Sequence, residues 1–123
     1  MKITEIAFSS YPVTDIVRSR AFYEGVLKLT PGMITDSGGG KWVEYEIGPH
    51  TLGIGQAPGW KPSTDGCTVA LEVENFDEAV ATLKAANTPF RMGPFETPVC
   101  HMAMVTDPDD NTIIIHKRKP GHL

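Results

Sequence analysis

The fold is indicated first by a turn and a strand near the end of the chain, Asp107-Pro108-Asp109-Asp110-Asn111-Thr112-Ile113-Ile114-Ile115-His116. Pro108 fixes φ, and the short Asp and Asn side chains around it bond to nearby backbone, which is turn chemistry. Alternation along the strand places Ile114 and His116 on one face and Ile113 and Ile115 on the other. Because both faces carry apolar residues, the strand is predicted to lie inside a sheet that has helices behind it.

The composition is that of one ordinary globular domain spanning residues 1–123. The chain is 41% hydrophobic and 21% charged, with a formal net charge of -4. That charge argues against a nucleic-acid partner, which needs a basic stripe. The basic run at residues 117–119 and His122 are expected to belong to a solvated C-terminal tail.

Membrane and export signals are missing from the sequence, so a cytoplasmic protein without a membrane partner is expected. No stretch approaches the roughly 20 apolar residues of a membrane helix, and the first residues lack a signal-peptide core. The two cysteines, Cys67 and Cys100, do not form a Cys-x-x-Cys pair. This spacing favours free thiols in a reducing compartment.

The order of expected elements repeats once along the chain. Module 1, about residues 1–57, reads as a strand over 3–10, a helix capped by Asp15, and strands around Met33, over 41–47 and over 51–56. A linker at about 58–66 is rich in Pro and Gly. Module 2, about residues 67–118, reads as a strand over 68–73, a helix from the cap Asn75 to near Asn87, and strands over 90–92, 99–105 and 112–116. An offset of about 60 residues between two halves of like order suggests two βαβββ modules.

Two motifs carry a resemblance to a known family. The first motif lies before and within the first expected helix, at residues 13–15 and 19–27. The second motif lies before the last strand, at residues 107–111. Together they resemble the glyoxalase/bleomycin-resistance/extradiol-dioxygenase group, the vicinal oxygen chelate superfamily. The resemblance implies an α+β fold of two βαβββ modules whose curved mixed sheets surround an open cavity, with helices on the convex side, and a homodimer. Asp110 stands where the family pattern usually has Gly, and Asp tolerates the left-handed backbone of such a turn.

The family's enzymes generally hold one divalent metal ion on His, Glu or Gln side chains. By the resemblance, the two first-strand His positions fall on Phe8 and Thr68, and the last-strand Glu position falls on Ile114. Gln56 is the one plausible donor at the fourth position. Because Phe and Ile supply no donor atoms, the usual metal chemistry is not expected, and we predict no cofactor.

An apolar wall at these positions predicts a pocket for a small apolar or aromatic molecule. Trp60 either closes over such a ligand, packs at a dimer contact or anchors the linker. Alternation along the strands also places polar side chains on the same faces as this apolar wall. The predicted ligand-binding residues are Phe8, Ser10, Gln56, Trp60, Thr68, Ile114 and His116.

The histidines leave chemical alternatives open. His116 is either a polar anchor for a ligand, a proton-transfer group or a solvated histidine, since an imidazole titrates near neutral pH. His101 and Cys100 are adjacent in a strand, so they face opposite ways and do not form a nucleophile–base pair within it.

Two functions follow as hypotheses, and the sequence leaves open whether the protein is an enzyme. The first is a metal-independent, bleomycin-resistance-like protein that binds a small molecule. The second is a lyase, isomerase or dioxygenase that holds Zn, Ni, Mn or Fe with an unorthodox ligand set, such as Gln56 and His116 or a dimer partner's His101.

Overall fold

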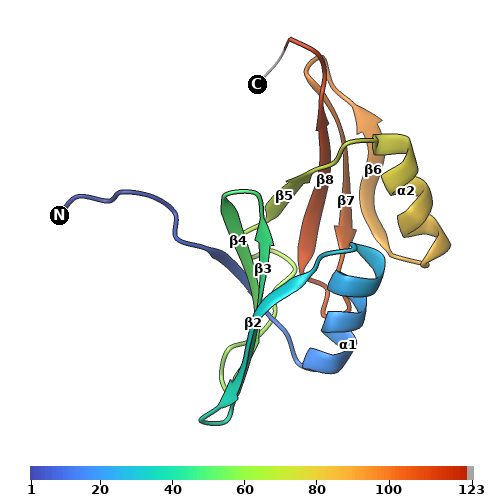
Figure 1. The fold of residues 1–123 in the computed structure, drawn as a ribbon. Coiled ribbons are helices and arrows are strands. Elements are labelled where there is room, and N and C mark those ends of the chain that lie inside the picture. Colours follow the sequence, from blue (N-terminus) through green and yellow to red (C-terminus); the bar gives the residue numbers. More distant parts are fainter. Residues whose placement is uncertain (122–123) are drawn as a thin grey trace. The chain divides into compact units, whose positions relative to one another are not determined.

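A computed structural model of the protein describes residues 1–121 and shows an α+β fold with two βαβββ modules (Figure 1). Contacts divide the chain into two compact units, Met1–Pro62 and a second that begins at Ser63. We call them the N-terminal and C-terminal modules. Of the residues expected in a solvated C-terminal tail, Lys117 and Arg118 belong instead to the last strand, Thr112–Arg118, and His122 lies outside the described residues.

The N-terminal module forms one mixed four-stranded sheet in the order β1-β4-β3-β2. Strand β1 runs parallel to β4, and the other neighbours are antiparallel. The helical segment between β1 and β2 changes from an α-helix to a π-helix, η1. The elements are β1 (Ser9–Pro12), α1 (Ile16–Arg20), η1 (Ala21–Val26), β2 (Pro31–Ser37), β3 (Gly40–Ile47) and β4 (His50–Gln56).

The C-terminal module repeats this topology with the order β5-β8-β7-β6. Strand β5 is parallel to β8, which therefore lies between β5 and β7, as the apolar character of both its faces predicts. The elements are β5 (Val69–Glu72), α2 (Phe76–Ala85), β6 (Phe90–Glu96), β7 (Cys100–Thr106) and β8 (Thr112–Arg118). The repeated order of elements predicted from the sequence is confirmed.

Both predicted helix caps are present. The Asp15 carboxylate accepts a hydrogen bond from the Arg18 N–H at 3.1 Å, and the Asn75 side chain accepts one from the Glu78 N–H at 3.0 Å. Each bond satisfies a first-turn donor that has no partner inside its helix. Within residues 1–121, none of the helices combines the length and the apolar character needed to cross a membrane.

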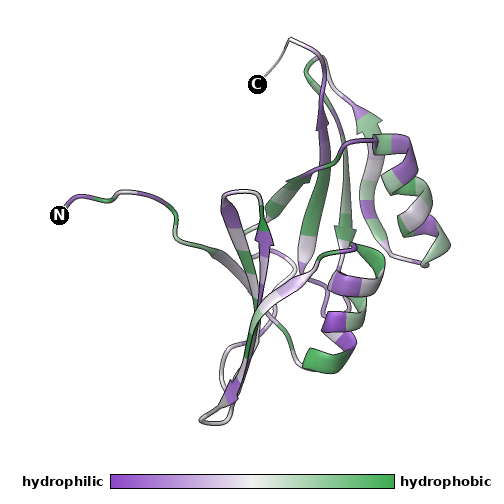
Figure 2. Cartoon of the chain, viewed as in Figure 1, coloured by the Kyte–Doolittle hydropathy of each residue, from purple (hydrophilic) through white to green (hydrophobic). Residues whose placement is uncertain are grey.

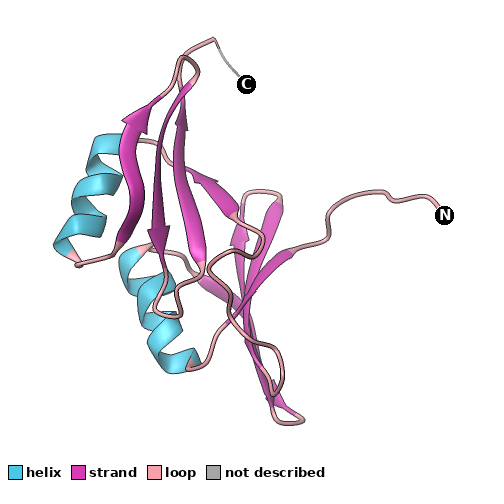
Figure 3. Ribbon diagram, turned by 180° about the vertical axis from the view of Figure 1, so that it is seen from behind, coloured by secondary structure: helices cyan, strands magenta, loops and turns pink. Residues whose placement is uncertain are grey.

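Each helix covers one face of its own sheet (Figure 3). In the N-terminal module, Tyr23 of η1 stacks on Tyr45 of β3 with ring centroids 6.0 Å apart. In the C-terminal module, Phe76 of α2 lies 5.6 Å from the ring of His101 on β7. Apolar and polar residues alternate along α2, and β8 is apolar in its first part and hydrophilic at its C-terminal end (Figure 2). We call the face of each sheet that lies away from its own helix the open face.

The turn before β8 is built around the buried carboxylate of Asp107. Its Oδ1 accepts from the N–H groups of Asp109 and Asn111 at 2.8 and 2.9 Å, and its Oδ2 accepts from the Asn111 side chain at 2.9 Å. Asp110 adopts φ 63°, the left-handed geometry expected where the family pattern has Gly. The turn thus sets the start of β8 and the direction of its side chains.

One predicted strand is misplaced and another is too short. The first strand was expected over residues 3–10, but β1 begins at Ser9 and runs through Pro12. Residues 1–8 pair with no strand in the described chain and leave Ile3 and Ile6 more than 80% exposed. The cause is that a β-prone segment becomes a strand only where a neighbouring strand is available. The strand expected over residues 90–92 is longer, because β6 extends to Glu96, whereas β2 contains Met33 as expected.

Candidate functional site

The open face of the N-terminal sheet carries a tryptophan. Along β3, Val43 and Tyr45 are at most 1% exposed and lie on the helix side, as the Tyr23–Tyr45 stack shows. Trp42 and Glu44 alternate with them and therefore lie on the open face. The indole Nε1 of Trp42 donates a hydrogen bond to the Glu44 carboxylate at 2.8 Å, which fixes the ring's orientation.

Two glycines of β4 make room for aromatic rings. A Cβ at Gly53 would lie 2.3 Å from Cη2 of Trp42, and a Cβ at Gly55 would lie 2.4 Å from Cζ3 of Trp60. Both distances are far inside van der Waals contact, so any other residue would displace the rings. The backbone of β4 is therefore the floor on which Trp42 and Trp60 lie.

Three rings form one cluster on this floor, which we call the aromatic face: Phe8, Trp42 and Trp60. The two indoles are stacked with centroids 6.4 Å apart and an interplanar angle of 25°. Phe8 meets Trp42 edge-on at 5.6 Å. Phe8 is 52% exposed and Trp60 is 38% exposed, so ring surface remains open to solvent. Such rings can accept a further flat apolar group by stacking or edge contact.

The open face of the C-terminal sheet is apolar in the middle and polar at one end. Ile113 and Ile115 are 0% and 2% exposed, whereas the alternate residues Ile114 and His116 are half-buried. Strand pairing sets Met104 beside Ile114, and it sets Met102 and Glu72 on either side of His116. The predicted division of β8 into two faces is confirmed.

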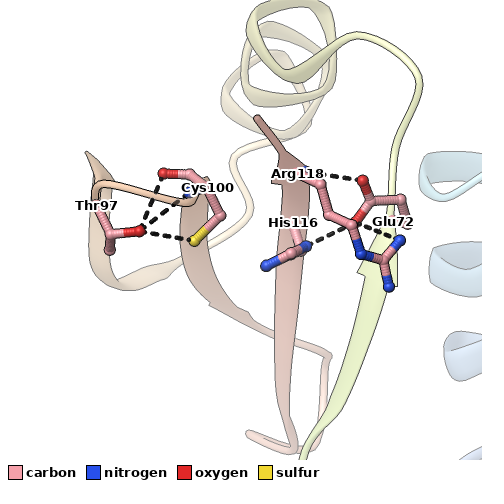
Figure 4. Close-up of polar contacts among 5 residues, drawn as sticks. All are labelled: Glu72, Thr97, Cys100, His116 and Arg118. Carbon is pink, nitrogen blue, oxygen red and sulfur yellow. Dashed lines mark hydrogen bonds and ion pairs between the residues drawn. The ribbon is translucent and has the colours of Figure 1, made fainter. Parts of the chain in front are cut away.

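Glu72 holds a polar cluster at the end of this face (Figure 4). Nδ1 of His116 lies 2.6 Å from its Oε1, and the Arg118 N–H donates to its Oε2 at 2.8 Å. Partial burial raises the pKa of Glu72, but the hydrogen bonds from Arg118 and His116, with their charges, lower it more. The pKa of Glu72 thus lies below its ordinary value, and the group is a carboxylate at neutral pH.

A second charged network lies on the helix side of the N-terminal module. Glu24 of η1 accepts from Arg20 at 2.6 Å and from the hydroxyl of buried Tyr45 at 2.9 Å. The hydrogen bond from Arg20 lowers the pKa of Glu24 more than burial raises it, and the bond from Tyr45 adds to the effect. Burial and the bond to Glu24 raise the pKa of Tyr45 far above its usual range. This network connects helix and sheet.

The predicted site residues fall into two groups. The structure places Phe8 and Trp60 together in the N-terminal module, and Ser10 pairs with Gly53 on the same open face. Three more lie in the C-terminal module: Thr68 is exposed just before β5, and Ile114 and His116 lie on the open face of β8. Gln56 lies apart from the aromatic cluster, because its Oε1 accepts a hydrogen bond from the Ile16 N–H at 2.9 Å.

The side chains at the family's metal positions do not fit a divalent ion. Phe8 and Ile114 have no donor atom, and the oxygen of Gln56 already receives the first N–H of α1. Within either module, residues 1–121 contain no group of three or more His, Cys, Asp or Glu side chains that would hold an ion. His101, considered above as a ligand, lies on the helix side against Phe76.

Sequence reasoning missed two residues of these faces, Trp42 and Glu72. The spaced glycines of β4 are a signal in the sequence that a large ring such as Trp42 crosses that strand. Glu72 depends on the parallel pairing of β5 with β8, which brings together residues 44 positions apart. Cys100 bonds to Thr97 in the β6–β7 turn, with Sγ 3.1 Å from Oγ1, and faces away from His101.

Two mixed sheets with the same relative strand order, each with a helical segment behind it, define a protein of two βαβββ modules. The sequence matches the family model of the Glyoxalase/Bleomycin resistance protein/Dioxygenase superfamily over residues 2–115. The chain therefore belongs to this superfamily. No curated protein matches the chain in sequence.

Solved structures of low sequence identity share the fold. An antibiotic binding protein from Streptomyces sp. CB03234 is 22% identical, with 97% of this chain and 99% of that chain covered and a TM-score of 0.78. Trypanothione-dependent glyoxalase I from Leishmania major is 23% identical (94% and 87% covered, TM-score 0.78). A fosfomycin resistance protein from Listeria monocytogenes is 14% identical (97% and 97% covered, TM-score 0.76).

Proposed function

We propose that the protein binds a flat, apolar or aromatic small molecule at the aromatic face of its N-terminal module, without a metal ion at the family's usual positions. The observation that carries the proposal is the set of three rings on a glycine floor. Because Gly53 and Gly55 have no side chains, Trp42 and Trp60 can lie directly on the backbone of β4. A preformed apolar surface binds ligands without the cost of ordering its own side chains.

The chemistry of the face supports an aromatic ligand over a polar one. Apolar area removed from water is worth about 25 cal/mol per Å², so a ring covering about 100 Å² gains about 2.5 kcal/mol. Glu44 is already bonded to the Trp42 indole, so it supports the ring and adds a negative charge nearby. A neutral or cationic aromatic compound is therefore favoured over an anionic one.

The competing function is a metal-dependent lyase, isomerase or dioxygenase. The described residues of either module contain no group of three or more His, Cys, Asp or Glu side chains that would hold the metal ion of such an enzyme. Two fold neighbours are named as an antibiotic binding protein and a fosfomycin resistance protein, which makes antibiotics a natural class to screen. We infer that sequestration of an aromatic compound describes the function better than turnover.

The test is a thermal-shift screen of aromatic antibiotics and metabolites, with Zn, Ni, Mn and Fe run in parallel. A ligand that binds the folded state raises the melting temperature. Tryptophan fluorescence then locates the site, because Trp42 and Trp60 are the chain's two tryptophans. We expect hits to change this fluorescence and to bind about tenfold more weakly to Trp42→Leu and Trp60→Leu.

Phe90→Leu, an aromatic substitution on the helix side of the C-terminal module, is the matched control and should leave the affinity unchanged. Two outcomes would overturn the proposal. One is a stoichiometric divalent ion that survives dialysis. The other is a set of ligands whose affinity is the same in both tryptophan variants.

A further inference from the structure

Two carboxylates lie beside the rings of the aromatic face. Glu44 and Glu46 follow Trp42 at every second position of β3, so all three side chains lie on the open face of the N-terminal sheet. Strand pairing sets Glu44 opposite Gly53 and Glu46 opposite Thr51 on β4. The ring of Trp42 also lies over Gly53. The two carboxylates and the indole therefore belong to one patch.

A neighbouring donor holds each carboxylate in place. Nε1 of Trp42 donates to Oε2 of Glu44 at 2.8 Å, and Oγ1 of Thr51 donates to Oε2 of Glu46 at 2.8 Å. Each of these bonds uses one oxygen, and the second oxygen of a carboxylate can still face a ligand. Glu46 is exposed, and its bond goes to a hydroxyl and not to a ring. Its charge can therefore be removed without loosening the bond that orients Trp42.

Positive side chains of this sheet lie on its other face. The basic residues of its four strands are Lys41 and His50. Lys41 precedes Trp42 on β3, and His50 pairs with Ile47, so alternation directs both side chains to the helix side. Lys61, in the linker, is exposed. The strands of the open face thus present aromatic rings and negative charge to a ligand.

We propose that the aromatic face selects a flat aromatic cation, such as an N-alkylated nitrogen heterocycle, and that Glu46 is a specificity-determining residue for its charge. The inference rests on the proposed function, because it names the ligand class of the same site. The face of an aromatic ring attracts a cation through its quadrupole. A carboxylate attracts the same cation but not a neutral ring of similar shape. Rings and carboxylates on one patch therefore favour the same class of compound.

Two matched probes test this preference on the full chain: 1-methylquinolinium, which is a cation, and 4-methylquinoline, which is neutral at neutral pH. Both have the same two fused rings and one methyl group. Calorimetry gives the affinities, and the NMR signals of the two indole N–H groups show whether a probe binds at the aromatic face. We expect the cation to bind about tenfold more tightly. Because salt screens exposed charges, about 0.5 M NaCl should reduce this preference.

The variant Glu46→Gln isolates the charge. Its amide oxygen can still accept the hydrogen bond from Thr51, so the shape of the face is kept. The preference for the cation should fall to about threefold, the worth of losing one exposed ion pair, while the affinity for 4-methylquinoline stays unchanged. Asp36→Asn is the matched control, because Asp36 pairs with Lys41 on the helix side of the same sheet. It removes one charge and should keep the full preference.

Equal binding of the two probes to the wild-type protein would overturn this inference and leave the proposed function intact. A full preference in Glu46→Gln would also overturn it. So would an equal reduction in Asp36→Asn, because the net charge of the protein would then explain the selectivity. If neither probe bound, or if binding left both indole signals unmoved, the aromatic face would not be the site, and the proposed function would fall together with this inference.

Discussion

The open face of the N-terminal sheet carries three aromatic rings over two glycines, whereas the open face of the C-terminal sheet carries methionines, an isoleucine and a His–Glu pair. Both sheets have the same strand order and the same parallel pair. The helix sides are alike in burying aliphatic residues of the central strands. The buried side chains on the helix sides therefore stabilise the topology that both modules share. The side chains on the open faces differ in chemistry between the two modules.

A similar contrast separates two glutamates with lowered pKa values. Glu24 lies on the helix side of its module and joins Arg20 to the buried hydroxyl of Tyr45. Glu72 lies on the open face of its module and orients His116. Glu24 therefore stabilises the packing of helix on sheet, whereas Glu72 orients a half-buried imidazole on the open face.

The largest predicted effect tests the two faces of a single strand. Ile113→Ala should lower the free energy of unfolding by about 3 kcal/mol, because its side chain is 0% exposed and leaves a cavity. Ile114→Ala, one residue along on the open face, should cost about 1 kcal/mol, since its side chain is only half-buried. Urea unfolding measures both. Equal losses would contradict the assignment of an open face.

A smaller effect is predicted for the glycine floor of the N-terminal module. Gly53→Ala places a Cβ 2.3 Å from Trp42, so the indole must move, at a cost of about 2 kcal/mol. It should also abolish the response of tryptophan fluorescence to aromatic ligands. The matched control is Gly32→Ala in β2, where the nearest atom would be 3.7 Å away and ligand binding should persist. If Gly53→Ala still bound aromatic ligands, the position of the Trp42 indole would not matter for binding.

The smallest effect concerns Glu24 and acid. Because the pKa of Glu24 is lowered in the folded state, its contribution is complete above the unfolded pKa, about 4.3, and is lost as the pH falls through the folded value. Glu24→Gln should therefore be less stable than the wild type at about pH 7, and the difference should shrink at about pH 3. Urea midpoints at the two pH values measure it. A difference that is unchanged by pH would exclude an ionised Glu24.

Much of the fold could be predicted from local patterns. Helix caps at Asp15 and Asn75, the turn after Asp107 and the alternation of β8 all depend on residues within a few positions of one another. The first strand could not be predicted in the same way. Residues 3–8 have strand-like composition, yet strand formation needs a neighbour, and only Ser9–Pro12 have one in β4.

The candidate sites likewise combine features that local sequence predicts with contacts that depend on the tertiary structure. Residue type and strand alternation are local properties, so the sequence is enough to predict that Ile114 and His116 share a face. The positions of Phe8, Thr68 and Ile114 at the family's metal-ligand sites are an expectation from the family resemblance. The contacts of Trp42 over Gly53 and of Glu72 with His116 become visible in the folded chain alone. Both contacts come from strand register, which is fixed by packing across the whole sheet and not by any short stretch of chain.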